Sequence, residues 1–251
     1  MSEIFAITDK GMVREKNEDC FLVNSEVKNN GELYVSNVNN FVIAVADGMG
    51  GARGGEIASF LVLDSLSDIN VEDSFLDIRK KLKEINQRVN NYAKSNKDLY
   101  GMGSTLVGLL YNQHKSIIFN LGDSRLYLFR KGYIRQLTKD HSLVQRLQDI
   151  GEISREEKKE HKLSNILTQC LGGDKISEID PEVIEDITFT EGDLVIMCSD
   201  GLYNMLDDDI FEEMLKKDCN IHTLGKSLIY EANLRGGEDN MTLILVKVGG
   251  E

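Results

Sequence analysis

Four aspartates stand at the ends of apolar stretches that have the length and composition of β-strands. Asp47 follows FVIAVA, Asp123 follows IIFNLG, Asp200 follows LVIMCS, and Asp239 comes just before MTLILVKV. Glycine adjoins the first three aspartates, and a glycine backbone can turn sharply or approach a ligand closely. Because buried strands direct such side chains to one place, we expect the four carboxylates to lie together.

A cluster of carboxylates without matching bases is electrostatically unfavourable. Like charges raise one another's pKa, and removing a carboxylate from water is costly. A divalent cation relieves both problems, and ligand sets made only of oxygen favour Mg²⁺ or Mn²⁺ over softer metals. The four aspartates therefore predict a metal site.

Composition excludes several classes of protein. With 29 basic and 42 acidic residues, the chain has a formal net charge of -13, which argues against nucleic acid or an anionic membrane as the main partner. Its 251 residues are enough to bury a sizeable core. No stretch approaches the ~18 apolar residues of a membrane span, and the N-terminus lacks the features of a signal peptide. The four cysteines show no C-x-x-C spacing, which indicates reduced thiols in a soluble, cytoplasmic protein.

The pattern of apolar residues predicts one domain over residues 1–251, with no linker or repeat. Strand-like runs cover 4–8, 32–36, 41–46, 104–111, 116–121, 125–130, 194–198 and 241–248. Helical periodicity covers 55–67, 73 to about 95, 207–217 and 223–233. The turns at 121–124 and 130–133 are predicted to close antiparallel hairpins. Segregated helices and antiparallel strands favour an α+β layered sandwich with helices outside sheet. The charge-dense residues 142–173, called the flap below, are predicted to form a surface excursion with short helices.

Five short motifs follow one another along the chain. They are Arg14-x-x-Asn17-Glu18-Asp19, Asp47-Gly48-Met49-Gly50-Gly51, Gly122-Asp123-Ser124-Arg125, Ser199-Asp200-Gly201 and Glu238-Asp239-Asn240. One Asp-Gly pair would indicate little. The order and spacing of all five, over about residues 4–248, resemble the metal-dependent protein phosphatases of the PP2C family.

The resemblance implies a fold, an activity and a set of metal ligands. The fold is a four-layer α-β-β-α sandwich of two antiparallel sheets flanked by helices. The activity is hydrolysis of phosphoserine and phosphothreonine by a metal-activated water, without a covalent phosphoenzyme, using Mn²⁺ or Mg²⁺. In the family, the aspartate matching Asp47 bridges two metals, and the carbonyl matching Gly48 binds the second. Acids matching Asp200 and Asp239 complete the first, and Asp123 looks like the position of a third, weaker metal.

The N-terminal motif matches the remaining site residues of the family. Arg14 matches the arginine that binds the substrate phosphate, a role that suits a planar and permanently charged fork. Glu18 and Asp19 match acids that hold metal-bound waters in place. By analogy with the family, the implied partners are phosphorylated proteins and a cognate serine/threonine kinase, and we expect a monomer.

Two positions depart from other members of the family. Met49 stands where many eukaryotic relatives have a histidine that is proposed as the general acid. We therefore hypothesise that a metal-bound water protonates the leaving group. Asn204 stands where some relatives have an acid near the third metal, and a neutral ligand predicts weak binding of that ion.

Some local patterns have a simpler structural explanation. Residues 48–54 suggest a dinucleotide-binding loop, but Arg53 replaces its last glycine and Asp47 would repel pyrophosphate. Residues 225–227 imitate the end of a P-loop without a preceding strand. For His141, we favour a structural hydrogen bond over proton transfer.

Two other functions stay open at this point. Two-metal chemistry does not identify the leaving group, so a hydrolase of small phosphoesters or nucleotides is the main alternative. A catalytically inactive module that binds phosphoproteins is the other. The complete set of acids, together with Arg14, argues against the inactive module.

Overall fold

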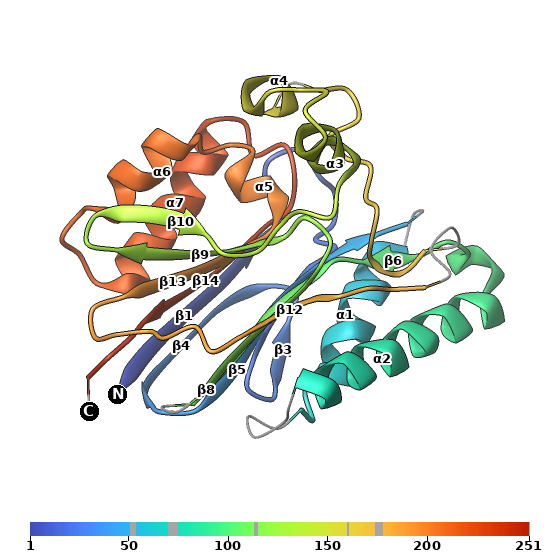
Figure 1. Ribbon diagram of the computed structural model, residues 1–251, viewed down its shortest axis with the longest axis horizontal. Coiled ribbons are helices and arrows are strands. Elements are labelled where there is room, and N and C mark those ends of the chain that lie inside the picture. Colours follow the sequence, from blue (N-terminus) through green and yellow to red (C-terminus); the bar gives the residue numbers. More distant parts are fainter. Residues whose placement is uncertain (51–53, 70–74, 113–114, 160, 174–177, 251) are drawn as a thin grey trace.

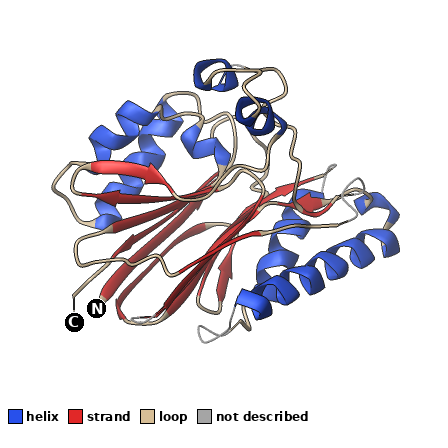
Figure 2. Ribbon diagram, in the orientation of Figure 1, coloured by secondary structure: helices blue, strands red, loops and turns tan. Residues whose placement is uncertain are grey.

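The structure, a computed structural model, describes residues 1–50, 54–69, 75–112, 115–159, 161–173 and 178–250. Two antiparallel sheets lie face to face, and helices cover the outer face of each sheet (Figure 1, Figure 2). This arrangement confirms the predicted four-layer α-β-β-α sandwich.

The first sheet contains the strands that precede Asp200 and follow Asp239. Its strand order is β10-β9-β13-β14-β1-β4, and the neighbours pair antiparallel. The bounds are β1 (Ser2–Asp9), β4 (Gly31–Val38), β9 (Arg125–Arg130), β10 (Tyr133–Gln136), β13 (Leu194–Cys198) and β14 (Met241–Lys247).

The second sheet contains the strands that end near Asp47 and Asp123. Its order is β11-β6-β5-β7-β8-β12, and β2 pairs with β5 and β3 beside this path. The bounds are β2 (Asp19–Val23), β3 (Glu26–Lys28), β5 (Phe41–Met49), β6 (Gly103–Ser104), β7 (Leu106–Asn112), β8 (Lys115–Leu121), β11 (Leu171–Gly172) and β12 (Glu182–Glu185).

Helices from two parts of the chain form the outer layers. Helices α1 (Gly54–Leu66) and α2 (Phe75–Ser95) cover the second sheet, and the short 3-10 helix η1 (Lys97–Leu99) follows them. Helices α5 (Asp200–Tyr203), α6 (Asp208–Leu215) and α7 (Ile221–Leu234) cover the first sheet. Within the described residues, no helix is both long and apolar enough to cross a membrane.

Alternation along the central strands separates three apolar cores. In β1, Ile4 and Ala6 face the space between the sheets, whereas Phe5 faces the helices of the first sheet. In β14, Ile244 points between the sheets and Leu245 points to the helices in the same way. Because both faces of these strands are covered, their sequences read as continuous apolar runs, and this made them easy to predict.

One of the two predicted hairpins is wrong. Residues 130–133 do join β9 to β10 as an antiparallel hairpin, through a turn with positive φ at Lys131 and Gly132. Residues 121–124 instead carry the chain from β8 in the second sheet to β9 in the first. Gly122 has a φ of +118°, and a Cβ there would lie 2.6 Å from the Thr105 side chain. This tight crossing places Asp123 between the two sheets.

The flap lies over one end of the sandwich (Figure 1). It contains α3 (Leu143–Asp149) and α4 (Arg155–Lys159) and returns to the second sheet at β11. Ser142 caps α3 by accepting a hydrogen bond from the Gln145 backbone, and an isolated bridge pairs Ser142 with Leu167. The described part of this segment thus contains two short helices.

Candidate metal and phosphate site

The four predicted aspartates converge at the end of the sandwich below the flap. Asp47 lies near the end of β5, Asp123 follows β8, Asp200 begins α5, and Asp239 precedes β14. Electrostatic repulsion links Asp47 to each of the other three. Two sheets thus supply the acids from four separate strand ends.

Thr105 fixes the backbone of Asp47 from the neighbouring strand. Its hydroxyl accepts a hydrogen bond from the Asp47 backbone at 3.0 Å, and its own backbone donates to the Asp47 carbonyl at 2.9 Å. Ser104 donates a further hydrogen bond to that carbonyl. These contacts fall where the predicted strand 104–111 is divided into β6 and β7, so the interruption serves the site.

The cluster cannot carry its full negative charge without compensation. Burial raises the pKa of Asp47 well above its usual range, and the neighbouring carboxylates raise it further. Burial also raises the pKa of Asp123 to about 8, with Asp200 and Asp140 adding to the effect. The pKa of Asp200 is raised by burial and by Asp239, although a hydrogen bond from Asp47 opposes this. Protons or cations must therefore accompany these acids.

Asp19 lies directly beneath the cluster, paired in register with Asp47 between β2 and β5. It is fully buried, and burial raises its pKa to about 7. Its Oδ2 accepts hydrogen bonds from Ser199 Oγ at 2.6 Å and Thr242 Oγ1 at 2.8 Å. Among the described residues, its Oδ1 has no hydrogen-bond partner. A buried carboxylate oxygen without a partner is costly, so this oxygen is available to a water or an ion.

Glu18 and the carbonyl of Gly48 border a space that glycine keeps open. A Cβ at Gly55, in the first turn of α1, would lie 2.6 Å from the Gly48 carbonyl oxygen and 2.7 Å from Glu18 Oε1. The Glu18 carboxylate also accepts a hydrogen bond from the Glu56 backbone. Burial raises the pKa of Glu18, whereas Arg14 opposes that effect.

Arg14, near the N-terminus, contacts Asp239, which lies near the C-terminus. Its Nη2 lies 2.6 Å from Asp239 Oδ2, and half of the Arg14 side chain is exposed. Asp239 Oδ1 accepts a hydrogen bond from the Asn240 backbone at 2.8 Å, so both oxygens of Asp239 have partners. The Arg14 guanidinium thus neutralises one acid of the cluster.

The donor set fits hard divalent cations. Carboxylates with raised pKa, the Gly48 carbonyl and the unpartnered Asp19 oxygen are all oxygen donors. Within the described residues, no three acidic, histidine or cysteine side chains already stand as a ligand set. Asp239 Oδ2 instead pairs with the Arg14 guanidinium at 2.6 Å.

Comparison with known proteins agrees with this geometry. A family model described as protein phosphatase 2C matches residues 31–227. The chain belongs to the PP2C family. The serine/threonine phosphatase stp of Listeria monocytogenes is 39% identical over 248 residues, which cover 96% of this chain and 93% of that protein. Protein phosphatase PhpP of Streptococcus pneumoniae is 34% identical over 257 residues, covering 99% and 98%.

Solved structures of PP2C-type phosphatases share the whole fold. Stp1 from Staphylococcus aureus has a TM-score of 0.86 at 32% identity, covering 100% of this chain and 96% of that one. The catalytic domain of the serine/threonine protein phosphatase PstP, in complex with two manganese ions, has a TM-score of 0.82 at 30% identity and full coverage of both chains.

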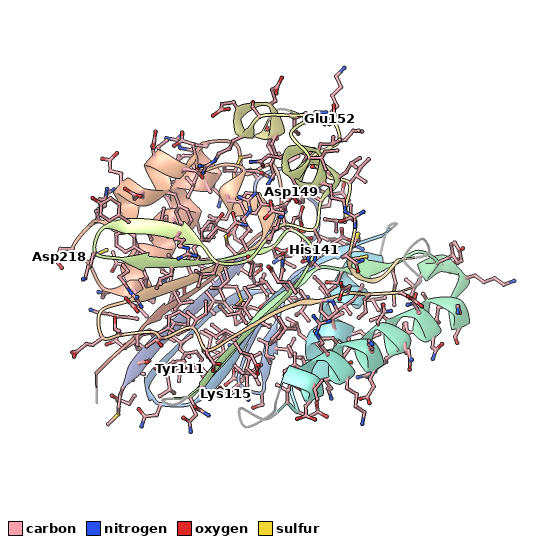
Figure 3. The ribbon with its side chains drawn as sticks, in the orientation of Figure 1. Tyr111, Lys115, His141, Asp149, Glu152 and Asp218 are labelled. Carbon is pink, nitrogen blue, oxygen red and sulfur yellow. The ribbon has the colours of Figure 1, made fainter. Side chains whose placement is uncertain are left out.

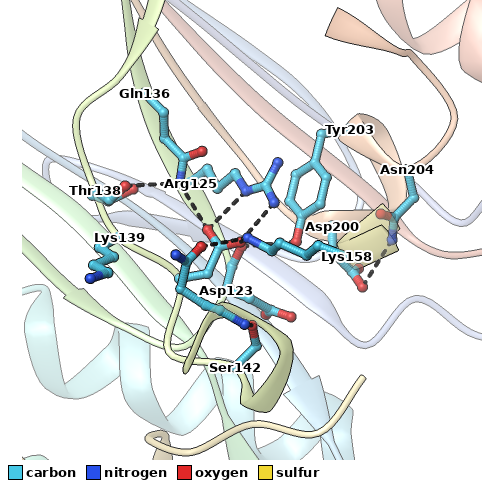
Figure 4. A network of polar contacts seen from close by, with 12 residues as sticks. Asp123, Arg125, Gln136, Thr138, Lys139, Ser142, Lys158, Asp200, Tyr203 and Asn204 are labelled. Carbon is cyan, nitrogen blue, oxygen red and sulfur yellow. Dashed lines mark hydrogen bonds and ion pairs between the residues drawn. The ribbon is translucent and has the colours of Figure 1, made fainter. Parts of the chain in front are cut away.

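This PP2C chain has a buried ionic network that connects the flap to Asp123 (Figure 4). The Asp140 side chain, only 2% exposed, accepts two hydrogen bonds from Arg125, at 2.9 and 2.7 Å, and one from Lys158 of α4 at 2.9 Å. The Arg125 guanidinium stacks 3.6 Å from the centre of the Tyr203 ring. The Tyr203 hydroxyl donates to the Asp123 carbonyl at 3.0 Å.

Sequence reasoning missed this network, although Arg125 lies in one of the five motifs and Asp140 adjoins His141. Arg125 follows a turn and Asp140 lies in the polar run 138–142, so neither residue stands out in the sequence. Nothing in the spacing showed that Lys158, 18 residues beyond Asp140, would complete the group.

His141 supports the loops around Asp123. Its backbone donates a hydrogen bond to the Gly122 carbonyl at 2.8 Å, and its Nδ1 accepts one from the Gly122 backbone at 3.3 Å. Its carbonyl accepts a hydrogen bond from the Thr168 backbone, which ties the flap to the same turn. Figure 3 shows His141 below the flap residues Asp149 and Glu152. Burial lowers the pKa of His141. The geometry therefore favours the structural role over proton transfer.

The two positions that depart from family members lie near the site. Asn204 Nδ2 lies 3.3 Å from Asp200 Oδ2, so its amide contacts one of the clustered acids. Met49 is half-buried at the end of β5, close to Gly103. Its thioether is no proton donor at neutral pH.

Residues 225–227, which imitate the end of a P-loop, lie within helix α7 and form no phosphate-binding loop. Gly225 lies within α7 against the ring of Phe5, where a larger residue would clash. Lys226 pairs with Glu32 at 3.0 Å. The predictions for Gly51 and Arg53 lie outside the described residues.

Proposed function

We propose that the chain is a metal-dependent phosphatase that hydrolyses phosphoserine and phosphothreonine monoesters by direct attack of an activated water, without a covalent phosphoenzyme. The observation that carries this proposal is the cluster of mutually repelling aspartates with Arg14 at its mouth. A cation-binding pocket next to a permanently charged, half-exposed guanidinium fits a substrate that carries a phosphate dianion.

The donor set suggests how Mn²⁺ or Mg²⁺ would be held. Asp47 would bridge two ions, with the Gly48 carbonyl on one of them and with Asp200 and Asp239 on the other. Asp123 would hold a third ion, more weakly because the nearby Asn204 is neutral. When bound, such ions supply the positive charge and the activated water that phosphate-ester hydrolysis requires.

The remaining residues position the substrate and the donors. Arg14 would exchange its contact with Asp239 for two oxygens of the phosphate. Glu18 and Asp19 would orient water through oxygens that face the site. Because Met49 cannot donate a proton, the leaving alkoxide would take one from water.

The proposal extends to the whole protein. Residues 1–251 would form a single phosphatase domain that carries the flap over its site. The partners would be phosphorylated proteins and a cognate serine/threonine kinase, with neither nucleic acid nor membrane involved. The net charge of -13 supports this exclusion. We propose a cytoplasmic monomer, and the four free cysteines support the location.

The decisive experiment measures phosphate release from p-nitrophenyl phosphate and from phosphothreonine peptides, with Mn²⁺ and with a chelator. We expect release from both substrates with the metal and none with the chelator. Absence of metal-dependent phosphate release would refute the proposed enzymatic activity. Release from nucleotides or small esters, with peptides untouched, would favour the small-molecule hydrolase instead.

A further inference from the structure

The loop that carries Arg14 has a fixed shape. The Asn240 side-chain amide donates hydrogen bonds to the carbonyls of Lys10 at 2.9 Å and Lys16 at 2.8 Å, which closes residues 10–16 at both ends. The Met12 backbone donates to the Gly237 carbonyl at 2.8 Å. Gly11 has a φ of +77°, and a Cβ there would collide with that same carbonyl. These residues, 10–16, are called the Arg14 loop below.

Two apolar side chains of the Arg14 loop point into solvent beside the guanidinium. Met12 is 70% exposed and Val13 is 65% exposed. A single exposed apolar residue needs no explanation, but two adjacent ones on a closed loop form a small apolar surface. Hydrogen bonds fix the backbone of the Arg14 loop, so a ligand can contact this apolar surface without the entropy cost of ordering the loop.

A turn of two glycines continues the surface away from Met12. A Cβ at Gly237 would lie 2.9 Å from Met12 Cγ, and one at Gly236 would lie 3.7 Å from Met205 Sδ. Both glycines have positive φ, so larger residues would be strained there. The turn thus leaves a shallow surface without side chains between Met12 and Met205. The flexible thioethers of these methionines adapt to varied apolar side chains.

We infer that Met12 and Val13 contact the substrate residue next to the phosphorylated serine or threonine, and that they favour an apolar side chain at that position. The inference rests on the proposed function, because Arg14 must hold the phosphate. Successive residues of an extended peptide lie about 3.3–3.8 Å apart. If Arg14 holds the phosphate, the substrate residue next to the phosphorylated one therefore lies close enough to contact the enzyme residues one or two positions before Arg14. These are Val13 and Met12.

The test compares phosphothreonine peptides that differ only in the two residues flanking the phosphothreonine. These are both Leu, both Ser or both Asp, and p-nitrophenyl phosphate serves as a substrate without flanks. The variant is Met12→Ser/Val13→Ser, and Met12→Leu is the conservative variant. The matched control is Leu76→Ser/Tyr100→Ser, which alters side chains that are 74% and 69% exposed on α2 and after η1.

We expect the wild type to prefer the Leu-flanked peptide. The double serine variant should lose about three- to tenfold in kcat/KM on that peptide, mainly through KM, which corresponds to the apolar area of two partly covered side chains. Its activity on p-nitrophenyl phosphate and on the Ser-flanked peptide should be unchanged. Met12→Leu and the control pair should keep the wild-type preference.

Several results would overturn the inference. They are an equal loss on all substrates, no loss on the Leu-flanked peptide, or a wild-type preference for the Asp-flanked peptide, which would assign recognition to Lys10 and Lys16. If the wild type releases phosphate with Mn²⁺ but the double serine variant has the same peptide preference as the wild type, only this inference fails. If it releases none, the proposed function fails and the inference with it.

Discussion

At the scale of single residues, the clustered aspartates have unequal surroundings. Asp47 interacts with Asp19, Asp123, Asp200 and Asp239, whereas the strongest repulsion on Asp123 comes from Asp200 and Asp140. Asp47 also belongs to a strand whose backbone Thr105 fixes from the side. Its position is therefore both more central and more rigid.

This difference predicts unequal losses on mutation. Asp47→Asn should lower kcat by at least about a hundredfold, because it removes the carboxylate proposed to bridge two ions. Asp123→Asn should lower kcat by about tenfold or less at saturating Mn²⁺. Both are measured with p-nitrophenyl phosphate. Equal losses would show that the proposed division of roles is wrong.

Arg14 and the metal are predicted to compete for Asp239. Arg14→Ala frees Asp239 Oδ2 and removes a positive charge from the site, so Mn²⁺ should bind several-fold more tightly to the substrate-free protein while phosphate binds more weakly. Isothermal titration calorimetry measures both affinities. Arg88→Ala is the control, since Arg88 is 51% exposed and pairs with Asp64 at 3.1 Å. Unchanged or weaker Mn²⁺ binding by Arg14→Ala would contradict the competition.

Sequence could locate the acids but not their partners. Asp47, Asp123, Asp200 and Asp239 each follow or precede an apolar run, and the run marks the strand end. The contact of Asp239 with Arg14 spans 225 residues, so no local pattern encodes it. Contacts between residues so far apart in sequence depend on how the two sheets pack together. The pattern of a single segment holds no information about that packing.

At the scale of elements, the long strands and helices were predictable and the short ones were not. β13 and β14 are buried on both faces and form apolar runs, and α2 has a clear helical period. β3 and β11 have three and two residues, too few to show a period. The wrong hairpin at 121–124 has a similar cause. A short turn containing glycine looks the same whether the next strand joins the same sheet or the opposite one.

The flap is attached through Asp140, which predicts a pH-dependent contribution to stability. Burial alone would raise the pKa of Asp140, but Arg125 and Lys158 hold this pKa at about 2, below its ordinary 3.8. A depressed pKa in the folded state stabilises the protein above about pH 4, and the benefit is lost as the pH falls toward 2. Asp140→Asn should therefore lower the free energy of unfolding by about 2–4 kcal/mol at pH 7.

Urea unfolding at a series of pH values checks this expectation. The gap between wild type and Asp140→Asn should narrow between about pH 4 and pH 2, as the wild-type carboxylate takes up its proton. Asp180→Asn is the control, because Asp180 is 85% exposed in its pair with Arg79 and should change stability by less than about 1 kcal/mol. A gap that does not vary with pH would mean that Asp140 acts through packing and not through charge.

At the scale of the whole molecule, the acidic cluster opposes folding while the sheets support it. The three apolar cores hold strand ends from both sheets at one place, although the carboxylates there repel one another. The net charge of -13 adds to that repulsion over the whole surface. A ligand that binds only the folded arrangement of acids should therefore stabilise the entire protein.

Mn²⁺ is thus predicted to raise the melting temperature, independently of any catalytic turnover. At a free concentration of about 100 times its dissociation constant, one ion adds about 3 kcal/mol, or about 5–10 °C for a protein of this size. Differential scanning calorimetry with Mn²⁺ and with a chelator measures the shift. Asp47→Asn should melt no lower than wild type in chelator, since it removes a carboxyl group whose ionised form is disfavoured by burial and by its neighbours. It should show less than half of the wild-type shift with Mn²⁺. An Asp47→Asn variant that keeps the full shift would place the stabilising ion outside the cluster of strand-end aspartates.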